Sequence, residues 1–587
     1  MEIHPFNIAV RDTESSIDYI SFQTLIYRNA QLINQYFGES EVYVGLFCEP
    51  SVEMITGAWS ILAANRAYLP LAPEYPEERI RYMIEDSGIN VILTQEHLKT
   101  ELESIVPDHV KILTQSELKS LSLCGTSTLV DVHTCCKDRL AYLIYTSGSS
   151  GNPKGVMVTY ENISHQIAFM KSQFFFDQQD KILQKTPVSF DAAQWEVLAP
   201  AFGCQVIVGP KDCYRDPDLM IETLLEHDIS VLQCVPTLLQ ALVEHPLFTD
   251  CLGLKKVFSG GEILTRNLAV DFFQCLPHSQ LTNLYGPTEC TINSSTFTLS
   301  HASLNDYPDA ISIGKPVTNT LYHVLKENGQ AAEIGEIGEL YISGAQVARG
   351  YYQRDEMTKD KFIPNSAPYL LGHEVMYRTG DLVKLDIDGN THFVGRADSQ
   401  IKLRGYRVEL DEIRLAIENH KWVKTAAMVV KNDPRTGHQN LIACVELDER
   451  EAALMDQGSH GNHHQSKSNK LQVKAQLSNS GCRDISKCEA GSLFPLPGKE
   501  ATAEQRANAF GRKTYRYFEG LAPISKASLL NMIERMPKPA QIKGSIETLL
   551  LADFGHLLRN FGQFTSEERL LPKYAYASPG ALYATQM

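Results

Sequence analysis

The stretch "RLAYLIYTSGSSGNPKG" (residues 139–155) decides the fold, because an apolar run passes directly into small polar residues. Its first eight residues are mostly apolar and rich in large side chains, which is typical of a buried strand. The following stretch, "VMVTYENISHQIAFM", can form a strand and then a helix. The Gly/Ser segment is therefore predicted to be a loop that leaves a buried strand.

The composition of this loop favours a polyphosphate ligand. Its glycines let backbone N–H groups approach a ligand closely, its hydroxyls add donors, and its lysine adds a positive charge. The spacing is not that of a Walker A loop, and an ordinary polar turn is the alternative for the loop taken alone. The predicted phosphate-facing residues are Thr146, Ser147, Gly148, Gly151 and Lys154.

The composition limits the classes of protein. The chain has 587 residues, which suggests roughly three or four domains. A net charge of −16 argues against a general nucleic-acid binder. The N-terminal residues lack the pattern of a secretory signal, and no apolar run is long enough to span a bilayer. The 13 cysteines are scattered, as in a protein with reduced thiols. A cytoplasmic protein without nucleic-acid or membrane partners is therefore expected.

Strand-like runs alternate with helical stretches through the first part of the chain, which predicts parallel sheets covered on both faces. Four of these runs are "VYVGLFCEP" (42–50), "INVILT" (89–94), "CQVIVGP" (204–210) and "VLQCVP" (231–236). From about residue 335 the pattern changes to short β segments, and Asp388-Gly389-Asn390 predicts a hairpin turn.

Further motifs contain residues that are suited to bind a nucleotide. "NLYGPTEC" (283–290) places Asn283, Tyr285, Thr288 and Glu289 close together. Tyrosine offers a stacking face, threonine a donor, and glutamate a hard oxygen ligand for Mg²⁺. "YRTGDL" adds Asp381 as an acceptor for ribose hydroxyls, "GRADSQIKLRGYRVEL" adds Arg396 and Arg404, and "FDAAQWE" adds Asp191.

The order and spacing of these motifs resemble the adenylation domain of nonribosomal peptide synthetases, within the wider acyl-adenylate-forming family. The resemblance runs from about residue 17 to residue 446. It implies that an amino-acid carboxylate attacks the α-phosphorus of ATP and gives an aminoacyl-adenylate and pyrophosphate. Loop amides, Lys154 and Mg²⁺ on Glu289 would offset the repulsion between the two anions.

The resemblance also implies roles for single residues. The motif asparagine faces the adenine amine, the tyrosine faces the adenine ring, and the aspartate and arginine face the ribose. Asp398 resembles the hinge at which the small C-terminal subdomain rotates. The family's "LPLD" reads "LPLA" here, with Ala72, and little consequence is expected. The implied ATP-binding residues are Asn283, Tyr285, Gly286, Asp381 and Arg396.

A substrate pocket can be carried over in the same way. Asp191 corresponds to the family's partner for the substrate α-ammonium, which implies an α-amino acid. The amides in the pocket suit a neutral carboxamide, and no cation is present for a carboxylate, so glutamine is favoured over glutamate. The alternative is that Gln233 is a core amide bonded within the protein. The lining positions are Ala192, Trp195, Gln233, Phe258, Gly260, Leu284, Ile292 and Asn293.

The pocket also resembles the glutamine-type pocket of the indigoidine (blue pigment) synthetase family. In that family an FMN oxidase is inserted within the adenylation domain, and a carrier and a thioesterase follow. The last stretch, "LLPKYAYASPGALYATQM", resembles the flavin-binding start of such an oxidase. FMN is implied only for a complete oxidase domain. The implied FMN contacts are Arg512, Arg516, Ser578, Pro579 and Gly580.

The predicted fold is α/β, with four successive parts. Residues 1–394 form the large adenylation subdomain with parallel sheets and a β-rich part. Residues 395–447 begin the small α+β subdomain, 448–500 are a polar linker, and 501–587 are a truncated piece of a nitroreductase-like α+β domain.

The family's catalytic C-terminal lysine pattern, a carrier "GGxS" and a thioesterase G-x-S-x-G are not found in the sequence. A fragment of a longer synthetase is therefore expected, with the phosphopantetheine of a carrier and a thioesterase downstream. The alternatives are a stand-alone acyl- or aryl-CoA ligase, against which Asp191 argues, and a truncated, non-catalytic nucleotide-binding homologue.

Overall fold

The computed structural model describes most of the chain up to residue 447. The chain divides into two units, Met1–Ile417 with Ala426–Cys444, and Glu418–Thr425 with Val445–Met587. The first unit holds nearly all described elements. The described residues are 4–36, 43–120, 138–148, 152–299, 310–365, 374–398, 400–403, 406–420, 423–432, 439–447, 563–564 and 573–574.

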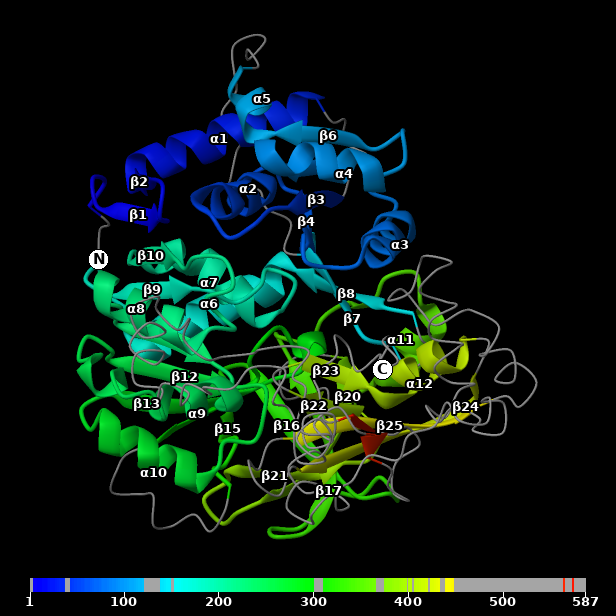
Figure 1. The fold of residues 1–587 in the computed structure, drawn as a ribbon. Helices are drawn as coiled ribbons and strands as arrows, with labels where there is room; N and C mark the ends of the chain where they lie inside the picture. The colour runs from blue at the N-terminus through cyan, green and yellow to red at the C-terminus, as the bar shows by residue number, and fades with distance from the viewer. Residues whose placement is uncertain are drawn as a thin grey trace, which may run out of the picture. The chain divides into compact units, whose positions relative to one another are not determined.

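A nine-stranded sheet has the order β15-β14-β13-β12-β11-β9-β10-β1-β2 (Figure 1). The six neighbouring strands from β13 to β1 run parallel to one another. Antiparallel pairs extend the sheet at both ends, with β2 next to β1, β14 next to β13, and β15 next to β14. The strands are β1 Ile8–Arg11, β2 Ser16–Asp18, β9 Lys181–Gln184, β10 Gln205–Val208, β11 Val231–Cys234, β12 Lys256–Gly260, β13 Gln280–Tyr285, β14 Ser295–Leu299 and β15 Lys315–Pro316.

A second sheet has seven strands in the order β18-β8-β7-β4-β3-β5-β6. Its middle strands are parallel, and β8 and β18 add antiparallel pairs at one edge. Every residue of β3 and β4 is buried, as expected for strands covered on both faces. The strands are β3 Tyr43–Phe47, β4 Ala67–Leu71, β5 Val91–Thr94, β6 Lys111–Thr114, β7 Leu140–Thr146, β8 Lys154–Thr159 and β18 Gly350–Tyr351.

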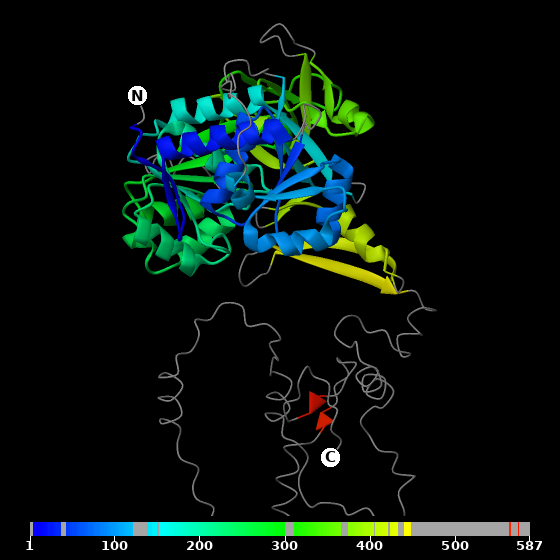
Figure 2. The same cartoon turned by 90° about the horizontal axis from the view of Figure 1, so that it is seen from above.

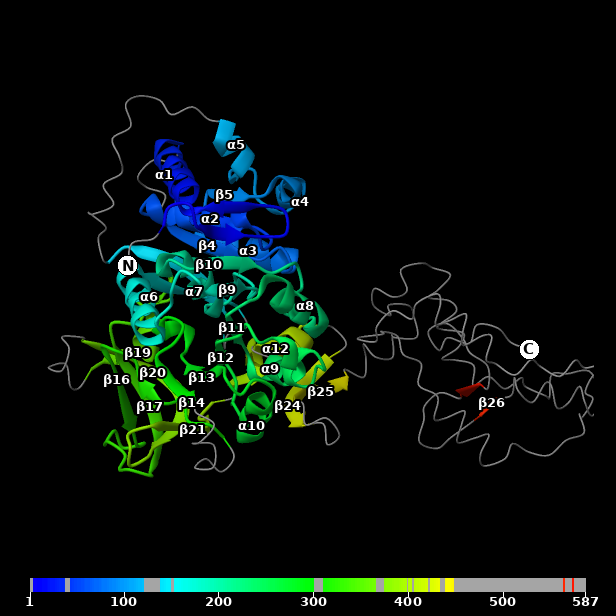
Figure 3. The ribbon, with the colours of Figure 1, turned by 90° about the vertical axis from the view of Figure 1, so that its left-hand side faces the viewer.

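Helices cover both sheets in layers. One apolar core contains residues of both sheets together with α1, α2, α6 and α7. A second core packs α8, α9 and α10 against the nine-stranded sheet, as Figure 3 shows, and a third packs α3 and α4 against the seven-stranded sheet. The helices are α1 Tyr19–Tyr36, α2 Val52–Ala63, α3 Glu77–Ser87, α4 Lys99–Ile105, α5 Gln115–Ser120, α6 Tyr160–Phe174, α7 Ala192–Leu198, α8 Pro217–His227, α9 Pro236–Val243 and α10 Arg266–Cys275.

The switch from β8 to α6 follows from local sequence. Thr159 accepts a hydrogen bond from the backbone N–H of Asn162, and the Asn162 side chain accepts one from the backbone of Thr159. This reciprocal capping box satisfies donors that a helix N-terminus otherwise leaves unpaired. The strand and helix predicted after the Gly/Ser loop are therefore confirmed. In Figure 2 the cyan α6 lies beside the dark-blue α1, and both line one groove.

A third sheet makes the β-rich part, in the order β16-β17-β20-β19, with β21 paired to β20. The turn from β20 to β21 closes with a hydrogen bond from Gly389 N–H to the Asp386 carbonyl, and Gly389 has φ 79°. The predicted hairpin at Asp388–Asn390 is thus confirmed. The elements are β16 Thr320–Leu325, β17 Ile337–Gly344, α11 Asp355–Lys361, β19 Phe362–Pro364, β20 Val375–Leu385 and β21 Thr391–Arg396.

A hairpin, a helix and a strand pair follow: β22 Gln400–Leu403, β23 Tyr406–Glu409, α12 Leu410–Glu418, β24 Val423–Asn432 and β25 Gln439–Leu447. The α/β class with parallel sheets and a β-rich part is confirmed. Beyond residue 447 only β26 (Gln563–Phe564) and β27 (Lys573–Tyr574) are described, so the nitroreductase-like part lies outside the described residues. No helix within the described ranges is both long and apolar enough to cross a membrane.

Candidate active site

The Gly/Ser loop joins β7 to β8, and the two strands pair so that Thr146 lies opposite Lys154. The sequence predicts Lys154 in the loop, but it is the first residue of β8 and is 7% exposed. The antiparallel ladder extends to the end of the loop and draws the lysine into the sheet. The Thr146 hydroxyl is buried and has no hydrogen-bond partner, so it can donate to a bound phosphate oxygen.

Three side chains from distant segments meet around Lys154. The Lys154 ammonium donates a hydrogen bond to the Tyr351 hydroxyl over 3.1 Å and lies 4.4 Å from the centre of its ring. The Tyr351 hydroxyl donates to Glu289 Oε1 over 2.7 Å, and Lys154 Nζ is 3.6 Å from that oxygen. The cluster is buried, so its charges act in a medium of low dielectric constant. Sequence reasoning missed Tyr351, since nothing in its local sequence points to this contact.

The loop backbone also has a carboxylate partner. The N–H of Gly148 donates a hydrogen bond to the side chain of Glu412 on α12. Burial raises the pKa of Glu412, although the charge of Arg79 and this hydrogen bond both act to lower it. A carboxylate thus contacts the loop where the sequence predicts phosphate. Gly151 lies outside the described residues, as do Arg512, Arg516, Ser578, Pro579 and Gly580.

The predicted adenine residues lie on β13. Asn283 donates from Nδ2 to the carbonyl of Ser312 over 2.8 Å, which orients its amide. Gly286 follows the strand, where an added Cβ would lie 2.2 Å from the carbonyl oxygen of Ile292. Only glycine fits at this close approach. Thr288 and Glu289 follow on the 3₁₀ turn η5 (Thr288–Cys290).

The predicted ribose and hinge residues form one hydrogen-bonded chain. The hydroxyl of Tyr285 donates to Asp381, and burial raises the pKa of this tyrosine well above its ordinary value. Arg396 lies 2.6 Å from Asp381 through one Nη and 2.7 Å from Asp398 through the other. Burial acts to raise the pKa of Asp398, but the hydrogen bonds and charge of Arg396 outweigh it and lower that pKa. The structure therefore links the predicted ribose aspartate to the predicted hinge aspartate through Arg396.

The predicted substrate residues also come together. Asp191 begins α7 and accepts hydrogen bonds from the Ala192 N–H and, over 2.6 Å, from the hydroxyl of Thr288. Strands β11, β12 and β13 are neighbours, and ligands of parallel sheets bind at carboxyl ends of strands. The lining residues are Ala192 and Trp195 on α7, Gln233 on β11, Phe258 and Gly260 on β12, Leu284 on β13, and Ile292 and Asn293 after η5.

Two amides in this group are held differently. Gln233 accepts a hydrogen bond at Oε1 from the indole N–H of Trp195, so half of its amide is bonded within the protein, as the core-amide alternative expects. The Nδ2 of Asn293 is buried and has no hydrogen-bond partner. Ile292 has φ 72°, which is uncommon for a β-branched residue and marks local strain next to Asn293.

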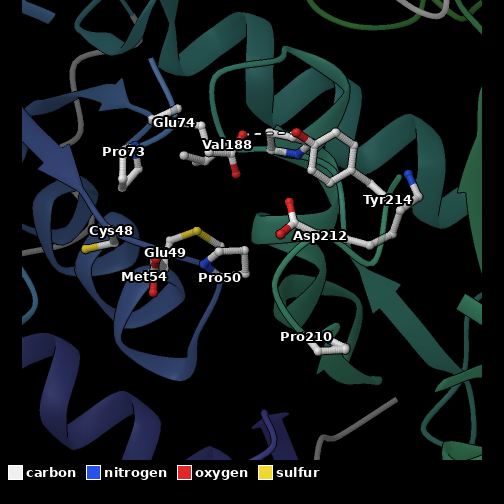
Figure 4. Close-up of a pocket in the computed structure, with 13 residues that line it drawn as sticks. Cys48, Glu49, Pro50, Met54, Pro73, Glu74, Val188, Pro210, Asp212 and Tyr214 are labelled. Carbon is white, nitrogen blue, oxygen red and sulfur yellow. Dashed lines mark hydrogen bonds between the residues drawn. The ribbon is translucent and has the colours of Figure 1, made fainter. Parts of the chain in front are cut away.

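A small cavity lies apart from these residues (Figure 4). Its volume is about 20 Å³, enough for roughly one water molecule. Ala72 and the buried Lys185 line it, and the hydroxyl of Tyr214 donates to Glu74 across it over 3.0 Å. Among the described residues that line this cavity there is no predicted site residue.

The described side chains can be examined as possible ligands for Mg²⁺. Within the described ranges, no group of three or more His, Cys, Asp or Glu side chains could hold a metal ion by itself. Mg²⁺ often takes one or two protein carboxylates and completes its shell with phosphate oxygens and water. The buried carboxylate of Glu289, beside the hydroxyl of Thr288, fits that second kind of site.

Comparison with known proteins identifies the chain. The family of AMP-binding enzymes matches residues 2–352. The chain belongs to the AMP-binding enzyme family. As a member of this family, it is an ATP-dependent adenylating enzyme.

Two relatives of this AMP-binding enzyme are indigoidine synthases. The protein from Streptomyces lavendulae is 51% identical over 588 residues, covering 100% of this chain and 46% of the relative. The one from Dickeya dadantii is 47% identical over 587 residues, covering 100% of this chain and 39% of the relative. The chain thus spans less than half the length of both.

A solved structure supports the resemblance to adenylation domains. PA1221, an NRPS protein containing adenylation and PCP domains, matches with a TM-score of 0.67 and 26% identity. The match covers 77% of this chain and 76% of PA1221. The resemblance to nonribosomal peptide synthetase adenylation domains is therefore confirmed.

Proposed function

We propose that this enzyme adenylates L-glutamine, within a nonribosomal peptide synthetase that makes an indigoidine-type pigment. The observation that carries the substrate is the buried Nδ2 of Asn293, which has no partner in the protein. An unpaired buried donor is unfavourable, so a ligand that accepts a hydrogen bond there is favoured. A glutamine side-chain carbonyl is such an acceptor.

Gln233 supports the same choice. Because its Oε1 accepts the indole N–H of Trp195, its NH₂ group is the part of the amide left to face a ligand. In this proposal both amide groups donate to the side-chain oxygen of the ligand. A glutamate carboxylate would be a buried charge without a cation among the lining residues, which disfavours it relative to glutamine.

The remaining residues bind and orient the reactants in this proposal. Asp191 holds the α-ammonium of the amino acid, and Thr288 fixes the Asp191 carboxylate through its hydroxyl. Lys154 and Thr146 offer positive charge and a hydroxyl donor to the phosphates. Glu289 would hold Mg²⁺, which neutralises phosphate charge when bound. These contacts favour the transition state mainly through position and electrostatics.

The wider assembly is also a proposal. The lengths of the two indigoidine synthases support a longer protein. The carrier that bears phosphopantetheine and the thioesterase rest on the resemblance to that family. An FMN oxidase within the adenylation domain would include residues 501–587. The subdomain boundary proposed at residue 394 falls inside β21, which ends at Arg396.

The test is ATP–pyrophosphate exchange by the full-length protein with single amino acids. Exchange should depend on L-glutamine and be weak with L-glutamate. Equal exchange with both would contradict the substrate assignment. No exchange with any amino acid, despite ATP binding, would favour the non-catalytic homologue.

A further inference from the structure

Tyr351 lies between the two charged residues that the proposed function assigns to phosphate and metal. Its side chain is 1% exposed, and its hydroxyl bonds to both Lys154 and Glu289. The lysine and the glutamate are far apart in the sequence, on β8 and η5. One phenol thus connects the end of the Gly/Ser loop to η5.

The backbone around Tyr351 fixes this position. We call residues 348–352 the strap. The N–H of Ala348 donates to the carbonyl of Glu289 over 2.9 Å, and the N–H of Tyr352 donates to the carbonyl of Gly155 over 2.8 Å. The strap is therefore hydrogen-bonded at one end to η5 and at the other to β8.

A third contact holds the tyrosine itself. The N–H of Tyr351 donates to Thr358 Oγ1, on α11, over 3.0 Å. An added Cβ at Gly350 would lie 2.5 Å from a Thr358 methyl carbon, so the strap and α11 pack closely. Side chains supported in this way keep the precise placement that a binding site needs.

The distances show what the hydroxyl does. Direct ammonium–carboxylate hydrogen bonds are typically about 2.7–2.9 Å long, whereas Lys154 Nζ lies 3.6 Å from Glu289 Oε1. The Tyr351 hydroxyl accepts from the ammonium and donates to the carboxylate, and its ring face lies under the ammonium. Without the hydroxyl, the two opposite charges would close into a direct buried pair. A glutamate in such a pair would bind a metal ion less well.

We propose that Tyr351 is a positioning residue that keeps Glu289 and Lys154 apart, so that Glu289 can bind Mg²⁺ while Lys154 faces the phosphates. This inference rests on the proposed roles of Glu289 and Lys154 in the ATP site. It concerns no contact of Tyr351 with the reactants. The conservative substitution Tyr351→Phe keeps the ring and removes only the hydroxyl.

The test measures metal binding without turnover. Mn²⁺ replaces Mg²⁺ and is followed by electron paramagnetic resonance in the full-length protein with α,β-methylene-ATP. Tyr351→Phe should weaken Mn²⁺ binding in the nucleotide complex about tenfold, the effect of one lost hydrogen bond to a charged group. Binding of the analogue without metal should change less than about twofold, since metal-free binding does not use Glu289.

The matched control is Tyr19→Phe. The Tyr19 hydroxyl donates to the carbonyls of Pro200 and Cys204 over 3.0 and 2.7 Å, so this variant also loses hydrogen bonds of a tyrosine hydroxyl. It should leave Mn²⁺ binding unchanged. A Tyr351→Phe protein that binds Mn²⁺ as tightly as the wild type, or a Tyr19→Phe protein that weakens it equally, would overturn the inference.

A second variant covers the case in which Tyr351→Phe does not fold. Thr358→Val removes the acceptor for the Tyr351 N–H and leaves the phenol in place. It should weaken Mn²⁺ binding about threefold, the effect of one lost neutral hydrogen bond. Unchanged binding in a folded Thr358→Val protein would overturn the inference. A wild type that shows no nucleotide-dependent Mn²⁺ binding would overturn the proposed metal site itself, which is a distinguishable result.

Discussion

The substrate pocket and the nucleotide side of the site meet at η5, and they treat charge differently. The predicted pocket residues include aromatic side chains in contact and two neutral amides, and one buried amide donor has no protein partner. On the proposed nucleotide side, charged groups already contact protein partners. The Tyr351 hydroxyl bridges Lys154 and Glu289, and Arg396 pairs directly with Asp381. The proposed pocket therefore offers its ligand an unpaired hydrogen-bond donor, whereas binding at the proposed nucleotide side would rearrange existing contacts.

This difference predicts which changes have the largest effects. Loss of a charge that stabilises the transition state, as proposed for Lys154, should mainly lower the rate of exchange. Loss of a charge that binds the substrate before reaction, as proposed for Asp191, should mainly lower the affinity for glutamine. Loss of a neutral amide, as at Gln233, should mainly lower the selectivity between amino acids. Exposed ion pairs should matter least.

The largest effect is expected from Lys154→Ala. Loss of one preorganised charge at the phosphates should lower the rate of exchange about 10²- to 10³-fold. The rate is measured by pyrophosphate exchange at saturating glutamine and ATP. Lys171→Ala, on α6 outside the site, is the matched control and should leave the rate unchanged. Equal losses in the two variants would contradict the role of Lys154.

Asp191→Ala should raise the glutamine concentration for half-maximal exchange about 10²-fold, because a partly buried charge partner of the ammonium is lost. The affinity for ATP, measured by calorimetry, should persist. Asp191→Asn keeps a helix-capping side chain without the charge and should show the same effect. Normal glutamine dependence in Asp191→Asn, or loss of ATP binding with glutamine dependence unchanged, would show that the assignment is wrong.

Gln233→Leu should reduce discrimination between glutamine and glutamate by about 1–3 kcal/mol, the effect of leaving a polar group unpaired. The ratio of kcat/KM for the two amino acids measures this. Gln184→Leu removes a buried amide on β9, outside the lining residues, and should leave the ratio unchanged. If Gln233→Leu also left it unchanged, Gln233 would be only a core amide.

The smallest effect is expected at the hinge. The pKa of Asp398 is lowered in the folded protein, so its contribution to stability is present above its unfolded pKa and is lost as pH falls through its folded pKa. Because Asp398 is partly exposed, Asp398→Asn should destabilise the protein at neutral pH by less than about 1 kcal/mol. Thermal melts should show the difference from wild type vanish at low pH. A difference that persists there would point to another cause.

Much of the architecture could be predicted from the sequence, because apolar runs, turn residues and capping residues act locally. The strand runs at β3, β5, β10 and β11 and the turn at Gly389 are where the patterns place them. The motifs also gave the predicted lining residues. Of these, Ala192 lies at the start of a helix, and Gly260 and Leu284 lie at or near the ends of strands.

The contacts between motifs could not be predicted in the same way. Tyr351 joins Lys154 and Glu289 through tertiary packing, and Arg396 joins Asp381 to Asp398 across β20 and β21. Such pairs depend on which strands become neighbours. The placement of Lys154 is one example, because β8 pairs both with β7 and with β18 of the strap, and the local sequence does not show either pairing.

The most direct measurement is a competition in which glutamine and glutamate are present in equal amounts. The full-length protein is given Mg²⁺, ATP and hydroxylamine, which traps each aminoacyl-adenylate as a hydroxamate, and mass spectrometry counts the two products. The pocket geometry predicts that the hydroxamate of glutamine predominates by at least about tenfold, the effect of burying a carboxylate without a cation. Equal yields, or a predominance of the glutamate product, would contradict selection by neutral amides.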